Sequence, residues 1–499
     1  MNNMHMDQGK DGKSIFERIS KTAEQNGDRI AFSSRAGNLT YAELWEKSGR
    51  LAGYIAGRIP DDAAPVMVYG HKEPYMLVSF LACARAHHPY CPVDVNTPAE
   101  RIRDIYEAIG TDFRIDRDSY RTAMEAVCRA PDIALQNKGE DIQYIIFTSG
   151  STGKPKGVRI TVANLENYLR WARTLSQTGQ DLAEIKHGSV FLNQAPFSFD
   201  LSVMDLYISL TTGGTLVSVD KDLQKDIPEM LRYMSVSGIE YWVSTPSFAD
   251  MCLADPGFGS GNLPELKVFL FCGETLGKKT AQELIERFPE AKIMNTYGPT
   301  ESTVCVTSVE ITEEMTKREG ALPVGVPKNG TTIKIDPDTQ EMIIVGDTVS
   351  PGYFNDPEKT AASFCMEDVE GRSVRAYHTG DKGHYGDDGM LYCDGRLDRQ
   401  IKLHGYRMEL GDIEENLAAI DGITAAAVIP ISRNGKIDSL TAFVTKTDEI
   451  ADDYSGRKFV RTAASERLPA YMIPKRIRFI GQMPLTANGK IDRKALEVM

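Results

Sequence analysis

The spacing of apolar residues divides the chain into alternating helices and strands. Helical periodicity extends over residues 15–60, 72–86 and 97–110. Short uninterrupted apolar runs are typical of strands that are buried on both faces. Such runs occur at residues 66–69, 145–147, 268–271 and 292–294. The alternation of the two patterns predicts an α/β fold with a largely parallel sheet.

The pattern changes after about residue 322. Short strands at 332–335, 342–345 and 390–393 are separated by Pro, Gly and Asp turns, which predicts a β-rich subdomain up to residue 397. The last hundred residues carry their own core pattern, with helices at 412–420 and 456–468 and strands at 425–429, 440–444 and 477–479. We therefore expect an N-terminal domain over residues 1–397 and a small α+β domain over 398–499.

Composition restricts the class of protein. The chain has 499 residues, of which 41% are hydrophobic and 25% charged, as in soluble globular proteins of more than one domain. A net charge of −13 argues against general nucleic-acid binding. The longest apolar stretch, residues 76–86, is too short to span a membrane, and no signal peptide is evident. Eight cysteines without a C-x-x-C pair favour free thiols over zinc or disulfides, and a cytoplasmic location.

A loop rich in glycine, hydroxyl groups and lysine carries the strongest chemical signal. Its sequence, TSGSTGKPKG at 148–157, follows an apolar strand pattern, and its backbone N–H groups, hydroxyls and lysines could surround an anion. It is not a Walker A loop, because Pro155 disfavours a helical conformation at Lys154, and the next helix signal comes only at Thr161. The loop predicts a polyphosphate site, and a plain hairpin remains the alternative when the loop is taken alone.

Four further motifs follow in order: NTYGPTE at 295–301, YHTGD at 377–381, GRLDRQIK at 395–402 and NGKID at 488–492. Together with the loop they resemble the adenylate-forming superfamily of amino-acid adenylation domains, acyl-CoA synthetases and luciferases. The resemblance extends from about residue 39 to 494. It implies a large adenylation domain of two α/β subdomains plus the β-rich subdomain, and a small mobile C-terminal domain that rotates about a hinge at Asp398.

The resemblance also implies that ATP and Mg²⁺ are cofactors. Tyr297 would offer its ring to adenine, Asp381 would accept the ribose hydroxyls, and Glu301 would be the ligand of Mg²⁺, which prefers carboxylate and phosphate oxygens. Catalytic roles fall to Thr300, Glu301 and Lys490. The residues implied in ATP binding are Thr148, Ser149, Ser151, Thr152, Lys156, Asn295, Thr296, Tyr297, Gly298, Pro299, Thr300, Asp381, Gly395, Arg396 and Lys490. Taken singly, these residues could equally be turn, packing or solvated surface residues.

The stretch FDLSVM at 199–204 restricts the class of substrate. In amino-acid adenylation domains an Asp at the place of Asp200 pairs with the substrate ammonium. A carboxylate that faces an apolar pocket is costly unless it is paired, so Asp200 favours a substrate with a cationic group. The alternative is that Asp200 caps a helix beginning near Ser202.

Longer matches at 193–207, 244–248, 271–274 and 402–410 are similar to the D-alanine:D-alanyl carrier protein ligases of teichoic acid D-alanylation. This implies D-alanine and a phosphopantetheinylated carrier protein as partners, and a monomer. The implied substrate site consists of Asp200, Leu201, Met204, Cys272, Val304 and Lys490, with room for about one methyl group. Two departures are a short stretch at 335–344 and Ala163 where many members of the superfamily have His.

Three alternatives remain open. The first is a free-standing peptide-synthetase adenylation domain for another small amino acid. The second is an acyl-CoA synthetase, which Asp200 disfavours because acyl substrates lack the ammonium. The third is a nucleotide-binding sensor that keeps the fold without the activity.

Overall fold

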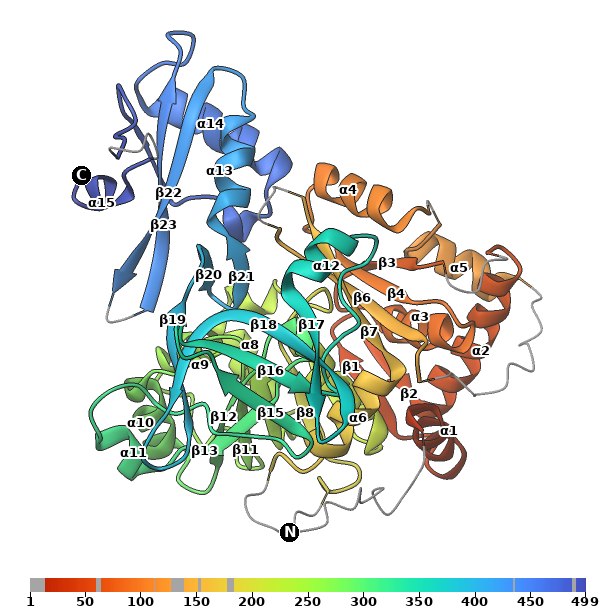
Figure 1. Ribbon diagram of the computed structural model, residues 1–499. Helices are drawn as coiled ribbons and strands as arrows, with labels where there is room; N and C mark the ends of the chain where they lie inside the picture. Colours follow the sequence, from red (N-terminus) through yellow and green to blue (C-terminus); the bar gives the residue numbers. More distant parts are fainter. Residues whose placement is uncertain are drawn as a thin grey trace.

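The computed structural model describes residues 14–59, 64–111, 113–126, 139–150, 154–176, 184–433, 436–486 and 491–499. Three sheets and their helices form a large body, and the C-terminal residues form a smaller lobe beside it, at the upper left in Figure 1. Within the described parts of the chain, no helix combines the length and apolarity needed to cross a bilayer.

The first α/β subdomain has a five-stranded sheet in the order β5-β3-β4-β6-β7. Its strands are β3 (Val66–Gly70), β4 (Tyr90–Asp94), β5 (Arg114–Ile115), β6 (Ile142–Thr148) and β7 (Lys156–Thr161). The neighbouring helices are α2 (Tyr41–Ala56), α3 (Pro74–Arg85), α4 (Ala99–Ile109), α5 (Arg117–Glu125) and α6 (Val162–Ala172). Strand β7 returns antiparallel to β6, so the 148–157 loop joins two strands rather than a strand and a helix, as the proline at 155 predicts.

The second α/β subdomain has a nine-stranded sheet in the order β14-β13-β12-β11-β10-β8-β9-β1-β2. Its strands are β1 (Ile30–Ser34), β2 (Gly37–Thr40), β8 (Val190–Asn193), β9 (Thr215–Ser218), β10 (Tyr241–Ser244), β11 (Val268–Phe271), β12 (Lys292–Tyr297), β13 (Thr307–Glu310) and β14 (Val326–Pro327). Its helices are α7 (Leu201–Thr211), the short η1 (Leu223–Lys225), α8 (Ile227–Ser235), α9 (Pro246–Leu253), α10 (Lys278–Arg287) and α11 (Glu313–Lys317). The six strands from β1 to β12 along this order are parallel, as the buried apolar runs predict.

One predicted helix is wrong in its middle. Residues 15–60 contain α1 (Ile15–Gln25) and α2, but between them β1 and β2 form an antiparallel hairpin. Strand β1 also pairs with β9, which lies far along the chain. This pairing is a tertiary contact, which overrides the helical periodicity of its neighbours.

The third subdomain is the predicted β-rich one, with β15 (Thr331–Ile335), β16 (Glu341–Gly346), β17 (Phe364–Val369), β18 (Arg372–Tyr385), β19 (Leu391–Arg396) and one helix, α12 (Pro357–Ser363). All its strand pairs are antiparallel. Within the short stretch noted at 335–344, residues 336–340 form a largely exposed turn between β15 and β16, and residues 341–344 begin β16. Strand β18 is long and bent, and it brings Asp381 opposite Arg396 of β19.

The C-terminal residues build a separate core. A hairpin of β20 (Gln400–Leu403) and β21 (Tyr406–Glu409) leads into α13 (Leu410–Ala418), β22 (Ile423–Arg433), β23 (Lys436–Lys446), α14 (Tyr454–Arg467), the short η3 (Ala470–Met472), β24 (Arg476–Phe479) and α15 (Arg493–Glu497). Buried residues between Ile401 and Ile477 form one apolar cluster. The domain boundary at Asp398 remains a prediction.

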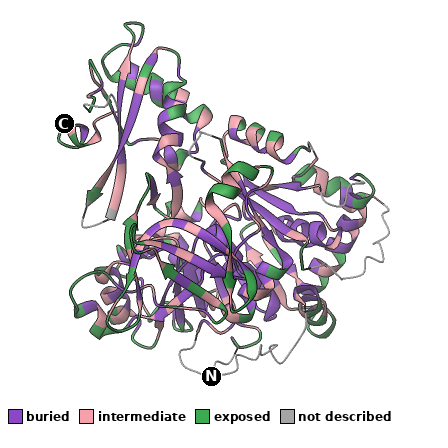
Figure 2. Cartoon of the chain, viewed as in Figure 1, coloured by how far each residue is buried: buried purple, intermediate pink, exposed green. Residues whose placement is uncertain are grey.

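The core of the large body lies where its two α/β sheets meet. One apolar cluster contains residues of β3 and β6 from the first sheet and of β8 and β11 from the second. Helix α7 is buried along its whole length and is mostly apolar, so it lies inside this shared core. Figure 2 shows the buried strands at the centre of the molecule. The sheets therefore hold α7 rigidly.

Candidate active site

A large cleft opens at the carboxyl ends of the parallel strands, where α/β sheets usually bind ligands. Its volume is about 1690 Å³. Seven residues predicted to bind ATP line it: Asn295, Thr296, Tyr297, Gly298, Asp381, Gly395 and Arg396. Asp398, the predicted hinge, also lines it. The fold thus gathers residues from β12, β18 and β19 around one space, although their binding roles remain predictions.

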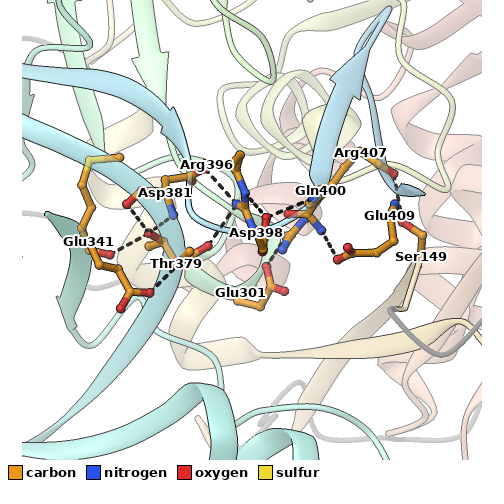
Figure 3. A network of polar contacts seen from close by, with 12 residues as sticks. Ser149, Glu301, Glu341, Thr379, Asp381, Arg396, Asp398, Gln400, Arg407 and Glu409 are labelled. Atoms are coloured by element: carbon orange, nitrogen blue, oxygen red, sulfur yellow. Dashed lines mark hydrogen bonds and ion pairs between the residues drawn. The ribbon is translucent and has the colours of Figure 1, made fainter. Parts of the chain in front are cut away.

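The Asp381 carboxylate is the centre of a polar network in this cleft (Figure 3). The Tyr297 hydroxyl donates to Asp381 Oδ2 at 2.7 Å. Arg396 Nη1 donates to Asp381 Oδ1 at 2.8 Å. Arg396 Nε also donates to Asp398 Oδ1 at 2.8 Å. Burial raises the pKa of Tyr297 well above its ordinary value, so its hydroxyl stays protonated as a donor. The carboxylate is therefore held in one orientation at the edge of the cleft.

The segment after β12 is a tight loop, and its sequence explains why. A Cβ on Gly298 would lie 2.4 Å from Cys305 Cα, so this position accepts only glycine. Thr303 and Val304 have φ values of 62° and 67°, a strained conformation for β-branched residues. Such strain is typical of functional sites. The loop carries Thr300 and Glu301, in the short helix η2 (Thr300–Ser302), together with Val304.

Glu301 is completely buried, with 0% of its surface exposed. Arg407 Nη1 donates to its Oε2 at 2.6 Å, and the Tyr353 hydroxyl donates to its Oε1 at 3.0 Å. Lys156 Nζ lies 3.4 Å from Oε1. Burial opposes ionisation, but Arg407 and Lys156 outweigh it and hold the pKa of Glu301 well below its ordinary value. Glu301 is therefore ionised, as a carboxylate ligand of a hard cation must be, but in this arrangement both of its oxygens are paired with protein groups, and its role towards Mg²⁺ remains a prediction.

Arg407 belongs to the β20–β21 hairpin of the C-terminal domain, and the sequence analysis assigned it no role. The same hairpin engages the predicted phosphate loop, since Ser149 Oγ donates to the Arg407 carbonyl and accepts from Glu409 N, both at 3.2 Å (Figure 3). Gly405 N donates to Glu274 Oε1 at 2.6 Å. The only feature of the sequence that could have pointed to Arg407 was the family match over residues 402–410. The hairpin thus contacts both Ser149 and Glu301 in this arrangement of the two domains.

Asp200 stands at the start of α7, yet its side chain makes no capping hydrogen bond. The helix-cap alternative therefore finds no support. Burial raises the pKa of Asp200 to about 6, and a hydrogen bond with Thr300 partly opposes this rise. Desolvation disfavours the charged form of a carboxylate, so the ionised Asp200 side chain gains from a cationic partner.

The residues predicted to surround the substrate side chain pack in one apolar cluster: Leu201, Met204, Cys272 and Val304. Cys272 Sγ lies 3.8 Å from the Val304 carbonyl oxygen. Because Leu201 and Met204 lie on α7 directly after Asp200, the charged group and the apolar wall are adjacent. Their contact with a substrate remains a prediction.

Three predicted site residues, Ser151, Thr152 and Lys490, lie outside the described residues. Thr148 ends β6 and Pro299 precedes η2, at the two loops described above. The described residues on either side of Lys490 contact one another and the C-terminal sheet. Leu485 pairs with Ile491, and Ile491 packs against a cluster on β22 and β23.

A second, smaller cavity of about 70 Å³ lies between the large body and the C-terminal domain. Four aromatic rings line it: Phe147 of β6, Phe199, which precedes Asp200, and Tyr406 and Tyr471 from the C-terminal domain. The Tyr406 and Tyr471 rings stack with centroids 4.0 Å apart, and Phe199 meets Tyr406 edge-on at 4.9 Å. This cavity reaches the Asp200 loop from the side of the C-terminal domain.

Comparison with known proteins shows the family of this chain. Residues 19–354 match the family of AMP-binding enzymes, and residues 412–490 match the AMP-binding enzyme C-terminal domain. D-alanine–D-alanyl carrier protein ligases from Bacillus mycoides (strain KBAB4) and Bacillus cytotoxicus (strain DSM 22905 / CIP 110041 / 391-98 / NVH 391-98) are each 43% identical to this chain, over 97% of it and 98% of the relative.

Solved structures show the same fold. Holo-PA1221, a protein with adenylation and PCP domains bound to a vinylsulfonamide inhibitor, superposes with a TM-score of 0.81 at 25% identity, over 97% of this chain and 84% of that one. The Vibrio cholerae adenylation domain AlmE, in complex with glycyl-adenosine-5′-phosphate, superposes with a TM-score of 0.79 at 22% identity, over 100% and 98% of the chains. The chain therefore belongs to the AMP-binding, adenylate-forming enzymes, in the family of D-alanine–D-alanyl carrier protein ligases.

Proposed function

We propose that this enzyme activates D-alanine with ATP as D-alanyl adenylate and then transfers it to the phosphopantetheine thiol of a D-alanyl carrier protein, for D-alanylation of teichoic acid. The observation that carries the proposal is the Asp200 carboxylate, which makes no capping bond and stands beside a small apolar wall. Such a site suits an ammonium group next to a methyl group. The family of the chain supports the same substrate.

In the first step, a carboxylate oxygen of D-alanine attacks the α-phosphorus of ATP, and the bond to pyrophosphate breaks. No protein nucleophile is needed, so the residues act by positioning and charge. Tyr297, Asp381 and Arg396 would hold the nucleoside, and Asp200 the ammonium. Glu301 would hold Mg²⁺ together with the ATP phosphates, and the ion would neutralise phosphate charge. Lys490 would stabilise the charge that develops between carboxylate and phosphate.

In the second step, the carrier thiol attacks the acyl carbon, its proton is lost, and AMP leaves. The ion pair of Arg407 with Glu301 supports the interpretation that this arrangement of domains serves transfer. We infer that the aromatic cavity beside Phe199 is the path of the thiol. We further propose that residues 398–499 rotate about Asp398 between the two steps.

The test is ATP–pyrophosphate exchange with D-alanine, L-alanine, glycine, serine and acetate, followed by loading of the phosphopantetheinylated carrier. D-alanine should give the fastest exchange. Faster exchange with L-alanine, glycine or serine would support the peptide-synthetase alternative, and faster exchange with acetate the acyl-CoA synthetase alternative. No exchange with any substrate would support the sensor.

We also propose that the enzyme acts as a monomer in the cytoplasm. A single chain supplies the residues of the cleft, so no second copy is needed to complete it. ATP and the phosphopantetheinylated carrier are the reactants expected in that compartment. Light scattering after size exclusion should give the mass of one chain.

Substitution of Cys272 tests how the site distinguishes D-alanine from L-alanine. The ammonium, the carboxylate and the methyl wall occupy three directions about the substrate Cα, so a thiol in the fourth direction would clash with the methyl group of L-alanine. Cys272→Ala should therefore improve kcat/KM for L-alanine relative to D-alanine by about 10- to 100-fold, the usual scale of one methyl-sized contact. An unchanged D/L ratio in the exchange assay would place the chiral discrimination elsewhere.

Arg407 tests the assignment of this domain arrangement to the transfer step. Arg407→Met removes the ion pair with Glu301, so carrier loading from preformed adenylate should slow by about 10-fold or more, as expected for a charged hydrogen bond. ATP–pyrophosphate exchange should stay within about twofold. Arg399→Met is the matched control, because Arg399 pairs with Glu414 inside the C-terminal domain. Equal losses in both half-reactions would contradict the assignment.

A further inference from the structure

A lysine is buried at the junction of the two α/β subdomains, outside the residues considered so far. Lys72 lies between β3 and α3 and is 3% exposed. Its Nζ donates to Asn193 Oδ1 and, at 2.5 Å, to the Ala195 carbonyl oxygen. It also stands 4.4 Å from the centroid of the Phe197 ring. All three partners belong to the segment that leads from the end of β8 to Asp200.

A buried ammonium is costly unless another charge and good hydrogen bonds compensate it. Here the compensating charge is Asp205, which is 1% exposed and reaches Lys72 through the amide of Asn193. Asn193 Nδ2 donates to Asp205 Oδ2 at 2.6 Å, and Ser218 Oγ donates to Asn193 Oδ1 at 3.0 Å. These bonds fix the orientation of the Asn193 amide, so the network has one geometry.

Asp205 lies on α7 next to Met204 and one helical turn after Leu201. The network therefore connects the first subdomain to both parts of the amino-acid site. Lys72 contacts the 193–197 segment before Asp200, and Asp205 belongs to the helix that presents the apolar wall. By contrast, the residues proposed to bind the nucleoside lie on β12, β18 and β19, which Lys72 does not contact through any of these bonds.

We propose that Lys72 is a positioning residue for the amino-acid site: its ammonium holds the 193–199 segment and, through Asn193 and Asp205, helix α7, so that Asp200 and the wall of Leu201 and Met204 keep their relative places. The inference rests on the proposed function for the identity of the amino acid. On this proposal, Lys72 stabilises the amino-acid site but not the ATP site. Loss of Lys72 should therefore weaken amino-acid binding selectively.

The experiment compares Lys72→Met with the wild-type enzyme by ATP–pyrophosphate exchange, with either substrate varied. Methionine keeps the length and apolar stem and removes the charge. The KM for the amino acid should rise by about 10-fold or more, on the scale of a lost charged hydrogen bond, while the KM for ATP stays within about twofold. Lys72→Arg, which retains the charge, should recover part of the amino-acid affinity.

Arg85→Met is the matched control. Arg85 ends α3, the helix that follows Lys72. Its Nη1 donates to the Trp45 carbonyl at 2.6 Å and to Ser48 Oγ at 2.8 Å, and its guanidinium stands 4.2 Å from the Trp45 ring centroid. It thus matches Lys72 in two hydrogen bonds and one ring contact but is directed to α2. This variant should lower Tm and leave the amino-acid KM unchanged.

Two results would overturn the proposal: an amino-acid KM that does not change in Lys72→Met, or a rise in the two KM values by the same factor. If Lys72→Met does not fold, Asp205→Asn is tested in its place, since an amide keeps the shape of the side chain and removes the counter-charge. The same selective rise in the amino-acid KM is expected. Its absence would count equally against the proposal. The KM is measured with whichever substrate the wild-type enzyme activates best. A failure of the D-alanine assignment therefore shows in the wild type and is separate from a failure at Lys72.

Discussion

Replacing Asp200 by asparagine should raise the KM for D-alanine by about 10- to 100-fold and leave the KM for ATP within about twofold. The expected size is that of a hydrogen bond between two charged groups, with the ammonium left buried beside a neutral amide. The measurement is initial-rate ATP–pyrophosphate exchange with each substrate varied. Asparagine keeps the shape of the side chain, so a change in KM reports the lost charge. An unaltered KM for D-alanine would remove Asp200 from the substrate site.

The same carboxylate predicts a pH dependence. Burial raises the pKa of Asp200 to about 6, so in the free enzyme the carboxyl group becomes protonated as the pH falls through about 6. D-alanine binding should weaken over that range in the wild type, because a neutral carboxyl group no longer attracts the ammonium. The decline should be absent in Asp200→Asn. A decline of equal size in the variant would assign the titration to another group.

The thermal stability of Asp200→Asn serves as the control for its folding. Because the pKa of Asp200 is raised in the folded enzyme, the folded state holds the proton more tightly than the unfolded chain, and the stability from that proton is lost as the pH rises through about 6. At neutral pH the ionised carboxylate therefore does not stabilise the free enzyme. The variant should have a Tm equal to or above that of the wild type, so weak D-alanine binding could not be attributed to unfolding.

Replacing Lys490 by alanine should reduce adenylate formation by about 100- to 1000-fold, the usual cost of removing one group that stabilises transition-state charge. Transfer from preformed D-alanyl adenylate to the carrier should be largely retained, since Lys490 is proposed to act only on the charge that develops during adenylate formation. The two half-reactions are measured separately, by pyrophosphate exchange and by carrier loading. Lys494→Ala, an exposed lysine on α15, is the matched control and should change neither rate.

A proline at the predicted hinge should give the reverse pattern. Asp398→Pro restricts φ to about −65° and should slow transfer if rotation about this residue is needed, while adenylate formation continues. Equal loss of both half-reactions in Lys490→Ala and Asp398→Pro would contradict alternation of the C-terminal domain.

Local features of this chain could be predicted from its sequence. The apolar run at 268–271 is strand β11, and the proline in the 148–157 loop correctly excluded a following helix. The five ordered motifs and the 199–204 stretch led to the family, because each concentrates its chemistry within a few consecutive residues. Gly298 is an example. The backbone at Cys305 leaves no space for a Cβ at this position, so the need for glycine can be recognised from a single residue of the sequence.

Tertiary structure decided which distant groups meet. Periodicity did not reveal the β1–β2 hairpin, since β1 is stabilised by pairing with β9. Arg407 and Glu301 are 106 positions apart, and Lys72 and Asn193 are 121 apart. A sequence shows that a buried charge needs a partner, but the folded topology decides which residue provides it, because the attraction acts over a few ångströms in space and is independent of distance along the chain.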